Sequence, residues 1–526
     1  MAITSDFLTA FSLPEILLLG VLCLTAGYVF HQVWLHPLAK YPGPLVSKLT
    51  HLYSVYHAFR SDRHADLYRL HQQYGPVVRF GPNHISIKDV RALEPIYGHG
   101  ANVRKSRWYS SFYSVSIFNA TDKDVHARKK RVMSQAFSDQ ALRAMEPHII
   151  SSIRAWCGAI GKDAAGSTSK SGASDPWTEP KDMAHWSACM VFDVLGEICF
   201  GRSFETSVRE ENQFFFPLMA LNVRILNVCG QLPILRTFGL DTYLRRGTAA
   251  SRERQIRFSR QQLADRLAID SEATQRRDII YYLQKARDPE TGEAYSQAEL
   301  ISETTLLMGA GFDTANTALA ATFYFLCKHP RILTRLSAEI RTAFSTLESI
   351  VSGPTMQQMV YLRACLSESM RLCPPVPMDL PREVQSGGLR VMNQDFPAGT
   401  IVGVPTYSLH HDEAYFDDPF AYRPTRWLLS GSPACQDDEG VSAETLARQK
   451  EAFVPFSLGP RACIGRNVAW MELEVGLARA LWLYEIRIAP GMEHVGVAPR
   501  GGEYLIRDNF VVGKEGPMIQ FRPRVD

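Results

Sequence analysis

The chain begins with a long apolar segment. Between Leu13 and Leu35 only three residues are strongly polar, and a helix of this length can cross a bilayer core roughly 30 Å thick. The alternative, a cleaved signal peptide, would be shorter and would start with basic residues, whereas the charged residue that precedes this segment is Asp6. We therefore expect residues 1–36 to form an N-terminal membrane anchor.

A short connector, residues 37–48, separates the anchor from the rest of the chain. Its three prolines prevent a continuous helix and restrict the direction of the chain. Lys40 and Lys48 follow the apolar segment, and no Lys or Arg precedes it. Because cytoplasmic flanks carry the excess of basic residues, this bias predicts that the large C-terminal part lies on the cytosolic side.

Short β-rich runs occur in two places. Val77–Phe80 and His84–Ile87 are joined by a Gly-Pro-Asn turn, which predicts a β-hairpin near the start of the soluble part. Leu389–Val391 and Thr400–Val404 flank a Pro-Ala-Gly turn and predict a small sheet. Strands are therefore expected to be the minor component of the fold.

Helical patterns dominate the rest of the chain. Ser296 and Glu299 form a capping-box pattern, which predicts a helix that runs to about Lys328 and ends before Pro330. A helix of more than thirty residues must cross the whole domain. A second helix, from about Met356 to Leu372, ends before two consecutive prolines. The predicted fold class is mainly α with minor β.

Composition and charge exclude several other classes of protein. The 526 residues are 46% hydrophobic and 21% charged, an ordinary globular balance that argues against disorder and against a multi-span membrane protein. A net charge of +3 is too small for its length to predict a nucleic-acid binder. The ten cysteines are scattered without a Cys-x-x-Cys pair, so we expect most of them to be reduced, buried thiols.

One cysteine stands in a distinctive segment. Residues Phe456 to Gly465 match the pattern F-x-x-G-x-R-x-C-x-G at all five fixed positions. A thiolate at Cys463 can ligate heme iron, and glycines on both sides of it let the backbone and the macrocycle come close to the sulfur. A helix is predicted over Asn467–Leu481, and its first amides can stabilise the thiolate. The alternative is one more buried cysteine, but the surrounding matches outweigh it.

On this evidence the sequence resembles the cytochrome P450 superfamily, in particular its fungal-type microsomal monooxygenases, over essentially the whole chain. The resemblance implies a cytochrome P450 fold for residues 49–526, with heme b held between the long central helix and the cysteine loop. It implies that Cys463 is the axial thiolate ligand of the iron. It also implies that Phe456, Arg461 and Gly465 contact the heme, with Arg461 paired to a propionate.

The long helix carries a second motif of this superfamily. Residues 310–314 read Ala-Gly-Phe-Asp-Thr and match its A-G-x-[DE]-T oxygen-activation segment. Glycine costs about 1 kcal/mol relative to alanine within a helix, so Gly309 and Gly311 together predict a groove or a local distortion. The resemblance implies that Thr314 hydrogen-bonds the oxygen and that Asp313 helps to deliver protons. Taken alone, a threonine bonded to its own helix carbonyl would be the commoner explanation.

A third motif is implied to be structural. Glu368 and Arg371 share one helix face and match the superfamily's E-x-x-R pair, which on its own is usually a solvated surface contact. Arg426, in the segment Pro-Thr-Arg-Trp, would complete a buried Glu–Arg–Arg cluster that fixes the chain leading to Cys463. Thr425 departs from the superfamily, in which many members have Glu at this place.

Further heme contacts are implied at three positions. His126 and Lys130 occupy the places of the superfamily's W-x-x-x-R, and both keep a polar donor; Arg382 matches a common third contact. The basic run Arg128–Arg131 has an alternative explanation as a solvated helix face. Some of its residues can point to the heme while others face an acidic partner.

The resemblance also indicates where substrate would bind. Trp108–Phe118 is rich in aromatic residues, and in this superfamily the corresponding region helps to roof the pocket. We expect an apolar or aromatic small-molecule substrate, although such a cluster is more often core. The segment from Tyr97 to Phe118 also resembles fungal benzoate-hydroxylase-like relatives, which include many enzymes of secondary metabolism. The residues expected to line the pocket are Tyr109, Phe112, Phe118, Met308, Phe312, Val376, Met378 and Phe510.

The function implied is a monooxygenase that inserts one atom of O2 into its substrate, in fungal secondary metabolism. Because no flavin domain fits within this length, electrons would come from NADPH through a separate NADPH-cytochrome P450 reductase, with cytochrome b5 as a second donor. The protein would be a single-pass protein of the endoplasmic reticulum membrane with a cytosolic catalytic domain and no nucleic-acid partner.

Several alternatives remain open at this point. They are a related isomerase or dehydratase that uses no oxygen, an aromatic-acid (benzoate-type) hydroxylase of primary catabolism, and a non-catalytic heme-binding membrane protein. The Asp313–Thr314 pair argues against the isomerase and the non-catalytic protein. A nicotinamide or flavin dehydrogenase is disfavoured, because Thr314 stands where a dinucleotide fingerprint needs its third glycine and the run lies inside a helix.

Overall fold

The computed structural model of the chain describes residues 12–112, 114–162, 177–232, 234, 238–240, 242–243, 246–269, 276–435 and 440–524. Residues 1–11 of the expected anchor and Tyr113 of the aromatic segment lie outside the described residues.

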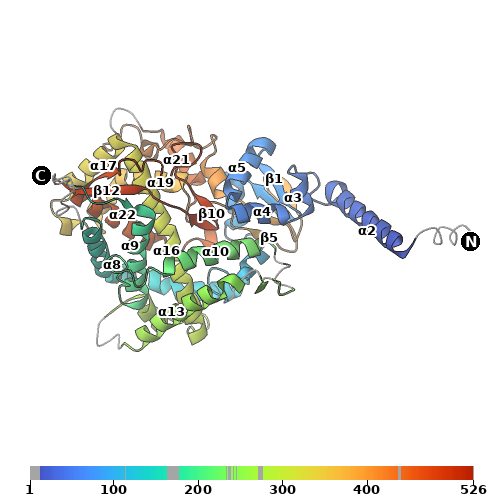
Figure 1. The fold of residues 1–526 in the computed structure, drawn as a ribbon, viewed down its shortest axis with the longest axis horizontal. Helices are drawn as coiled ribbons and strands as arrows, with labels where there is room; N and C mark the ends of the chain where they lie inside the picture. The colour runs from blue at the N-terminus through green and yellow to red at the C-terminus, as the bar shows by residue number, and fades with distance from the viewer. Residues whose placement is uncertain are drawn as a thin grey trace, which may run out of the picture.

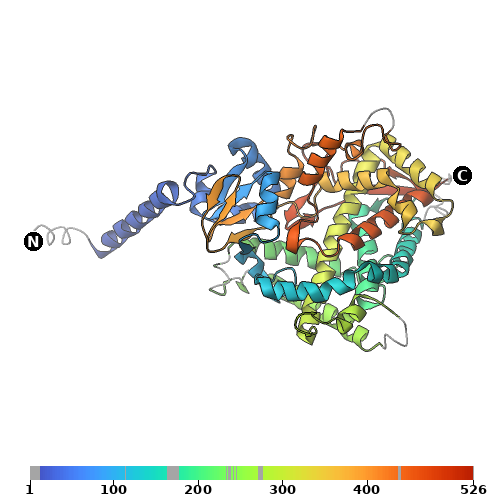
Figure 2. The ribbon, with the colours of Figure 1, turned by 180° about the vertical axis from the view of Figure 1, so that it is seen from behind.

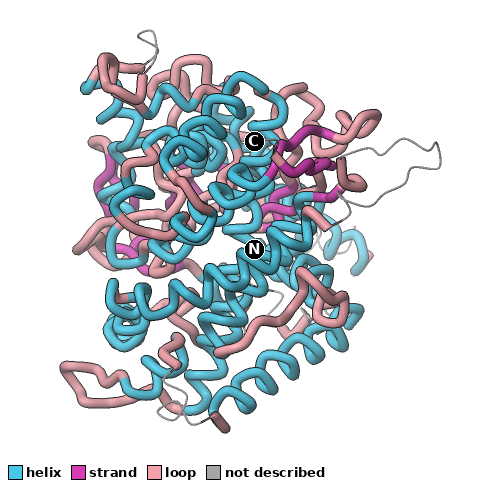
Figure 3. The backbone as a smooth tube through the Cα atoms, turned by 90° about the vertical axis from the view of Figure 1, so that its left-hand side faces the viewer, coloured by secondary structure: helices cyan, strands magenta, loops and turns pink. Residues whose placement is uncertain are grey.

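Helices make up most of the described backbone, as Figure 3 shows. They are α2 (Leu13–Phe30), α3 (Leu45–Leu49), α4 (Leu52–Arg60), α5 (Arg63–Tyr74), α6 (Leu93–Tyr97), α7 (Lys123–Ser134), α8 (Asp139–Ile160), α9 (Met183–Phe200), α10 (Phe215–Gln231), α13 (Ala249–Leu267), α15 (Ile279–Lys285), α16 (Gln297–Lys328), α17 (Pro330–Ala343), α18 (Pro354–Gln357), α19 (Val360–Leu372), α20 (Thr406–His410), α21 (Ala443–Ala452) and α22 (Arg466–Leu483).

Strands are short and form small sheets. They are β1 (Val77–Gly81), β2 (His84–Ile87), β3 (Val103–Lys105), β4 (Lys181–Asp182), β5 (Arg382–Val384), β6 (Leu389–Val391), β7 (Gln394–Phe396), β8 (Ile401–Gly403), β9 (Tyr484–Ile488), β10 (Arg507–Asn509), β11 (Val511–Gly513) and β12 (Met518–Pro523). The predicted class, mainly α with minor β, is confirmed.

The apolar N-terminal segment forms an exposed helix. At its start Glu15 accepts hydrogen bonds from the backbone N–H and the hydroxyl of Ser12 (2.7 and 2.8 Å), and a π-helical turn, His31–Leu35, continues α2. No residue of α2 is buried, and the helix projects away from the rest of the molecule in Figures 1 and 2. With a mean hydropathy of 1.9 over its most apolar 18 residues, the segment Leu13–Leu35 is a candidate transmembrane anchor.

The long helix α16 runs through the middle of the globular part (Figure 1). The predicted capping box is present, because Ser296 and Glu299 each accept a hydrogen bond from the other's backbone N–H (3.2 and 3.0 Å). α9, α13, α19 and α22 pack against it. α9 is also apolar enough to span a membrane, but 78% of its residues are buried inside the molecule, so it is a core helix.

The five-stranded sheet has the order β1-β2-β8-β5-β3. β1 and β2 form the predicted antiparallel hairpin, β8 joins β2 in parallel, and β5 pairs with β8 and β3 in the antiparallel sense. The register of β3 on β5 places Lys105 directly opposite Arg382. Like charges opposite each other destabilise a sheet, so an anion close to this pair would stabilise it.

The predicted sheet between Leu389–Val391 and Thr400–Val404 is wrong in its pairing. β6 pairs with β7, the strand missed by the sequence pattern, through a turn in which Met392 and Asn393 both have positive φ. Positive φ is unusual for methionine, so the sequence carried no turn signal there. β8, after the Pro-Ala-Gly turn, pairs with β2 and β5 instead.

The second predicted helix is interrupted. α18 ends at Gln357, and α19 starts at Val360 after Met359 leaves the helical conformation (φ −73°, ψ 65°). The carboxylate of Glu339, on α17, accepts hydrogen bonds from the first amides of α19, those of Tyr361 and Leu362 (3.2 and 3.1 Å). This helix cap comes from a distant part of the chain, which local sequence could not reveal.

The exposure of α2 leads to a prediction about the anchor. Deleting residues 2–30 removes no described buried residue, so we expect the melting temperature to stay within about 2 °C of the full-length value. The full-length protein should resist extraction from membranes by alkaline carbonate, whereas the deleted form should be extracted. A large loss of thermal stability would show that α2 packs on the globular part, contrary to the structure.

Candidate functional site

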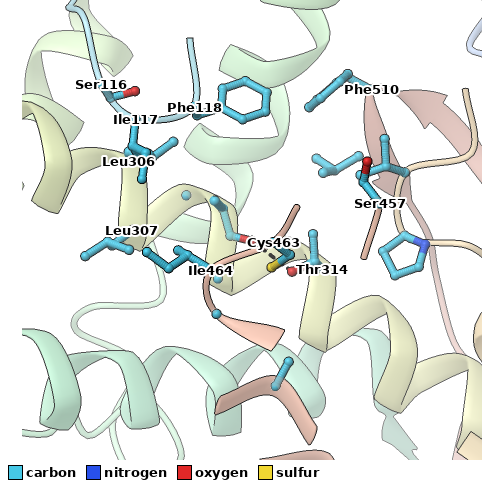
Figure 4. Close-up of a pocket in the computed structure, with 18 of the residues that line it drawn as sticks. Ser116, Ile117, Phe118, Leu306, Leu307, Thr314, Ser457, Cys463, Ile464 and Phe510 are labelled. Carbon is cyan, nitrogen blue, oxygen red and sulfur yellow. Dashed lines mark hydrogen bonds between the residues drawn. The ribbon is translucent and has the colours of Figure 1, made fainter. Parts of the chain in front are cut away.

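A cavity of about 780 Å³ lies between α16, the loop before α22 and the aromatic segment after β3. Cys463 and Thr314 contribute to its wall from opposite elements, and Phe118 and Phe510 contribute aromatic rings. Figure 4 shows the sulfur of Cys463 and the side chain of Thr314 in the same space, with both rings on the other side of the cavity. A thiol and a helical threonine therefore share one largely apolar cavity.

The loop that carries Cys463 is held by its own backbone. The Cys463 N–H donates to the carbonyl of Phe456 (2.9 Å), and both Phe456 and Gly465 line the cavity. Gly459 has a positive φ of 70°, and a Cβ there would lie 2.1 Å from the carbonyl oxygen of Tyr97. Glycine is thus required at this position for the loop to pack on α6.

The start of α22 adjoins the sulfur, as the sequence predicted. Gly465 is the N-cap residue of α22. Burial raises the pKa of the Cys463 thiol, and a hydrogen bond from the backbone amide of Gly465 opposes this effect. A free helix N-terminal amide next to the sulfur favours its charged form, which is the form that binds iron.

Basic side chains gather at one edge of the cavity. Lys105, His126, Lys130 and Arg461 line it. Lys130 Nζ donates to the carbonyl of Pro460 (2.7 Å) and Arg461 Nη1 to that of Ala120 (2.6 Å). Lys105 donates to the carbonyl of Phe118. These partners are neutral carbonyl groups, so they leave the positive charges uncompensated.

Arg382 is not among the described residues that line the cavity, and its contact with heme stays a prediction. Its guanidinium donates to the carbonyl of Leu380 (3.0 Å) and to the hydroxyl of Tyr109 (3.3 Å). The charge of Arg382 nevertheless acts on residues at the cavity edge, because it contributes to the lowered pKa values of Arg461 and His126.

The positive charge at this edge of the cavity bears on whether heme can bind there. Burial and the charge of Arg382 lower the pKa of Arg461 to about 10, and burial with the neighbouring cations lowers that of His126 to about 3. The pKa of the Lys105 ammonium is also lowered well below its usual value by burial, Arg382 and Arg461. Such mutual repulsion is relieved by an anion, and the two propionates of heme supply it. The donor set therefore fits heme, and Lys105 is the member of it that the sequence motifs missed.

Thr314 faces the cavity from α16 and donates to the carbonyl of Ala310 (2.8 Å). The helix is continuous across this region, so the two glycines mark close packing rather than a distortion. A Cβ at Gly311 would lie 2.8 Å from Leu195 of α9, and one at Gly309 would lie 3.1 Å from Met219 of α10.

Asp313 lies behind Thr314 and is not among the residues that line the cavity. Burial raises the pKa of its carboxyl to about 6, and the nearby charge of Lys514 opposes that rise. Asn316, one turn along α16, accepts a hydrogen bond from Lys514 Nζ (3.2 Å) when its amide is oriented to donate to Ala184 (3.1 Å). Asp313 can therefore hold or release a proton near neutral pH on the far side of α16 from the cavity.

The Glu–Arg–Arg cluster is brought together as the sequence predicted. Glu368, Arg371 and Arg426 are each fully buried. The Glu368 carboxylate accepts two hydrogen bonds from Arg371 and one from Arg426, all of 2.9 Å. Trp427 Nε1 and the backbone N–H of Arg423 add two more (both 3.0 Å). Together the guanidinium groups and these donors hold the pKa of Glu368 below its usual value, although burial acts to raise it.

A histidine connects this cluster to the cysteine loop. Arg371 Nη1 donates to the carbonyl of His410 (2.8 Å), and the Nε2 atom of His410 accepts from the backbone N–H of Val454 (3.1 Å). Burial and Arg371 lower the pKa of His410 to about 3, so the ring is neutral and able to accept. The sequence motifs did not reveal this link between Glu368 and the loop that carries Cys463.

The expected substrate pocket needs correction at four of its eight positions. Phe112, Phe118, Val376 and Phe510 line the cavity. Met308 and Phe312 are buried elsewhere, because they share the face of α16 that packs on α9, α10 and α13. Two further residues make contacts away from the cavity wall. The Tyr109 hydroxyl accepts a hydrogen bond from Arg382, and Met378 packs in an apolar cluster with Leu67, Leu70, Val78 and Phe80.

The roof of the cavity is tied to α16 by a buried carboxylate. Glu303 accepts from the backbone N–H of Ile117 (3.0 Å) and from Lys129 Nζ (3.0 Å). The other members of the basic run Arg128–Arg131 make two kinds of contact. Lys130 donates to the carbonyl of Pro460 in the cysteine loop. Arg128 and Arg131 form ion pairs with acids of this chain, Glu299, Glu293, Asp288 and Glu290, so they are not simply an outward face for an acidic partner.

These features define a heme-thiolate protein: a cysteine at a helix N-terminus, a threonine on the helix across the cavity, and cations placed for two carboxylates. Comparison with known proteins agrees. The family model described as Cytochrome P450 matches residues 39–501. The chain belongs to the cytochrome P450 family, and heme with a cysteine thiolate ligand is its cofactor.

Similar proteins come from fungi. The chain is 35% identical to the cytochrome P450 monooxygenase atnE of Emericella nidulans, over 99% of this chain and 98% of that protein. It is 35% identical to the cytochrome P450 monooxygenase poxM of Penicillium oxalicum (94% and 92%) and 33% identical to apf7 of Gibberella fujikuroi (96% and 97%). Within the family, the protein is thus a monooxygenase, an oxidoreductase that needs a redox partner and a substrate.

The buried Glu368 cluster predicts a large loss of stability on substitution. Glu368→Gln leaves two buried guanidinium groups without a counter-charge, so we expect a destabilisation of about 3–5 kcal/mol. Urea unfolding followed by tryptophan fluorescence measures it. As a control, Glu253→Gln removes an exposed ion pair with Arg257 and should cost less than about 0.5 kcal/mol. Equal stability of the two variants would contradict the structural role of Glu368.

The identity of the iron ligand is tested by spectroscopy. Cys463→Ala removes the thiolate, so we expect the reduced protein to lose the carbon monoxide-shifted absorbance that thiolate ligation produces. Cys435→Ala, at a cysteine that does not line the cavity, should keep it. A Cys463→Ala protein that retained the shifted band would rule out this residue as the ligand.

Proposed function

We propose that the protein inserts one atom of O2 into an apolar or aromatic small molecule of fungal secondary metabolism. The proposal rests on one observation above all: Thr314 and the sulfur of Cys463 share a cavity, with the acid Asp313 directly behind the threonine. When bound, heme supplies the activation of dioxygen. The chain's own residues then have to bind the substrate, exclude water and move protons.

Thr314 is placed to handle protons at the cavity. Its hydroxyl donates to the carbonyl of Ala310, which leaves the lone pairs of Oγ1 to accept from groups in the cavity. Asp313, with a pKa of about 6, carries a proton for part of the time at cellular pH. The two side chains together form a carboxylate–alcohol relay.

The cavity wall supports an apolar substrate. Phe112, Phe118, Val376 and Phe510 supply aliphatic and aromatic surface, and Glu303 fixes the roof segment through Ile117. A rigid apolar wall binds substrate by excluding water and orients it without charge. Tyr109, Met308, Phe312 and Met378 are not among the residues of this wall.

The electrons come from NADPH through a separate reductase, which we propose docks over the loop that carries Cys463; cytochrome b5 is a second donor. Arg466, exposed at the start of α22, adds positive charge to this face for an acidic partner. The exposed helix α2 supports a single-pass anchor formed by residues 1–36. We further propose that a connector over residues 37–48 leads to a catalytic domain over 49–526, on the cytosolic side of the endoplasmic reticulum membrane.

The test is turnover of the purified full-length protein with reductase, NADPH and a panel of terpenoids, polyketides, indole alkaloids and benzoates. Substrate-dependent consumption of NADPH and O2 with formation of an oxygenated product is expected. Rearrangement of a peroxide without consumption of NADPH or O2 would replace the proposal with an isomerase. A preference for benzoates would assign the protein to aromatic-acid catabolism.

The relay makes a prediction about pH. Asp313→Asn removes the proton donor, and we expect kcat to fall by about 100-fold or more with heme binding intact. In the unsubstituted protein kcat should decrease as pH rises above about 6, because a smaller fraction of Asp313 is protonated. The variant should lack this slope. A pH profile of product formation from pH 5.5 to 8.5 measures both effects.

A matched threonine supplies the control. Thr314→Val should lower the yield of product per NADPH consumed, because it removes the hydroxyl from the cavity. Thr322→Val removes a hydroxyl that is bonded in the same way, to the carbonyl of Ala318 (2.7 Å), but which does not line the cavity. The Thr322→Val variant should give an unchanged yield of product per NADPH consumed. Equal yields in both variants would exclude the relay.

A further inference from the structure

We propose that Asn222 and Gln255 form a polar anchor for the substrate, and that the substrate is an apolar molecule with a neutral hydrogen-bonding group, such as a carboxamide or a hydroxyl, at its far end. This proposal rests on the proposed function and assigns the substrate class. Asn222 belongs to α10 and Gln255 to α13, both residues are buried (7% and 8% exposed), and both line the cavity that holds Cys463.

The hydrogen bonding of the pair is incomplete. Asn222 Nδ2 donates to Gln255 Oε1 (2.6 Å), while Gln255 Nε2 has a thioether acceptor, Met219 Sδ, at 3.7 Å. Sulfur of this kind is a weak acceptor. Among the described contacts, Asn222 Oδ1 has no donor. The pair therefore presents an acceptor and a poorly satisfied donor to the cavity, and a buried amide without partners is unfavourable.

Three hydroxyl side chains that also line the cavity already have acceptors within the protein. Ser302 donates to the carbonyl of Val115 (3.1 Å), Thr305 to that of Ile301 (2.7 Å), and Ser116 to Asn119 Oδ1 (2.7 Å). Their hydroxyl hydrogens are used within the protein. Unlike these hydroxyls, the amide pair offers a ligand both a donor and an acceptor, and Arg252 and Arg260 of the same helix α13 add further donors to the cavity wall.

The pair lies away from the cysteine. Met219, which contacts Gln255, is one turn from Asn222 on α10 and meets α16 at Gly309. Gly309 precedes Thr314 by five residues, which is about 7 Å along a helix. A substrate held at the pair would therefore present to Cys463 a position about 7 Å or more from its polar group. Phe118 and Leu306 add apolar surface to the same cavity as Cys463 (Figure 4).

At the amide pair itself a neutral group completes more hydrogen bonds than a carboxylate, which would instead be favoured by Arg252 and Arg260 elsewhere on the wall. A carboxylate at neutral pH has no donor for Asn222 Oδ1, whereas a carboxamide supplies a donor and an acceptor on its nitrogen and oxygen, and a hydroxyl supplies both on one oxygen. A group that offers both can complete the hydrogen bonds of both amides in one contact. Discrimination between two ligands of the same shape then follows from the pair alone.

The test compares two probes of similar size, dodecanamide and methyl dodecanoate. The amide can donate and accept, whereas the ester can only accept. Dissociation constants are measured on the full-length ferric protein from the change in heme absorbance. This binding needs no reductase, NADPH or O2, so its outcome is independent of whether the proposed monooxygenase activity is found. We expect the protein to bind the amide about tenfold more tightly than the ester.

The double variant Asn222→Leu/Gln255→Leu should bind the two probes equally, with the ester affinity unchanged within about twofold. A purely structural role of the pair would instead weaken both probes together. Gln262→Leu is the matched control: Gln262 is also a buried amide on α13, accepts from Arg202 (3.0 Å) and does not line the cavity. It should keep the preference for the amide.

If the double variant does not load heme, Asn222→Leu alone replaces it. For that variant we expect the logarithm of the ratio of the two dissociation constants, ester to amide, to fall to half of its unsubstituted value or less. The proposal is overturned if the unsubstituted protein binds the two probes equally, if it binds neither, or if the variants keep its preference. Those results would assign the amide pair to the contact between α10 and α13, or to a bound water.

Discussion

The position of the cysteine loop depends on one buried carboxylate, that of Glu368. It is fully buried, and Arg371, Arg426, Trp427 and the backbone N–H of Arg423 donate five hydrogen bonds to it. Removing a charge from water is costly, and the cost is offset only while every hydrogen bond is made. Because Arg371 also holds the carbonyl of His410, whose ring accepts from Val454 just before the loop, the placement of Cys463 follows from ionic geometry as well as from apolar packing.

The cation cluster at the cavity edge has the opposite character. Lys105, Lys130 and Arg461 are brought close to Arg382 beside the neutral ring of His126, and the charge of Asp122 only partly offsets the lowered pKa of Arg461. Their mutual repulsion opposes folding of the protein without its cofactor and favours binding of a dianion. The Glu368 cluster is complete within the chain, whereas this one is completed by heme. Stability and cofactor binding are therefore coupled through charge on opposite sides of the same loop.

The two sides of α16 differ in the residues they carry and in their surroundings. Gly309, Gly311 and Thr314 lie along the cavity, where small side chains let α9 and α10 pack closely and leave room beside the sulfur. Asp313 faces the interior behind them, where burial raises its pKa and Lys514 restrains the rise. A single helix thus separates the chemistry at Cys463 from the group that we propose supplies protons to it, and Thr314 lies between the two.

Local sequence determined the elements whose signals are contiguous: the apolar helix α2, the capping box of α16, the β1–β2 hairpin, and the loop and helix around Cys463. Each depends on residues a few positions apart. Tertiary structure alone decided the cap that Glu339 places on α19, the pairing of β6 with β7, the inward turn of Lys105 and the burial of Met308 and Phe312 away from the cavity. These features depend on which segments meet in space. A motif states what type of residue a site needs, but the partners that fill its hydrogen bonds and the side of a helix that faces the cavity are set by long-range packing.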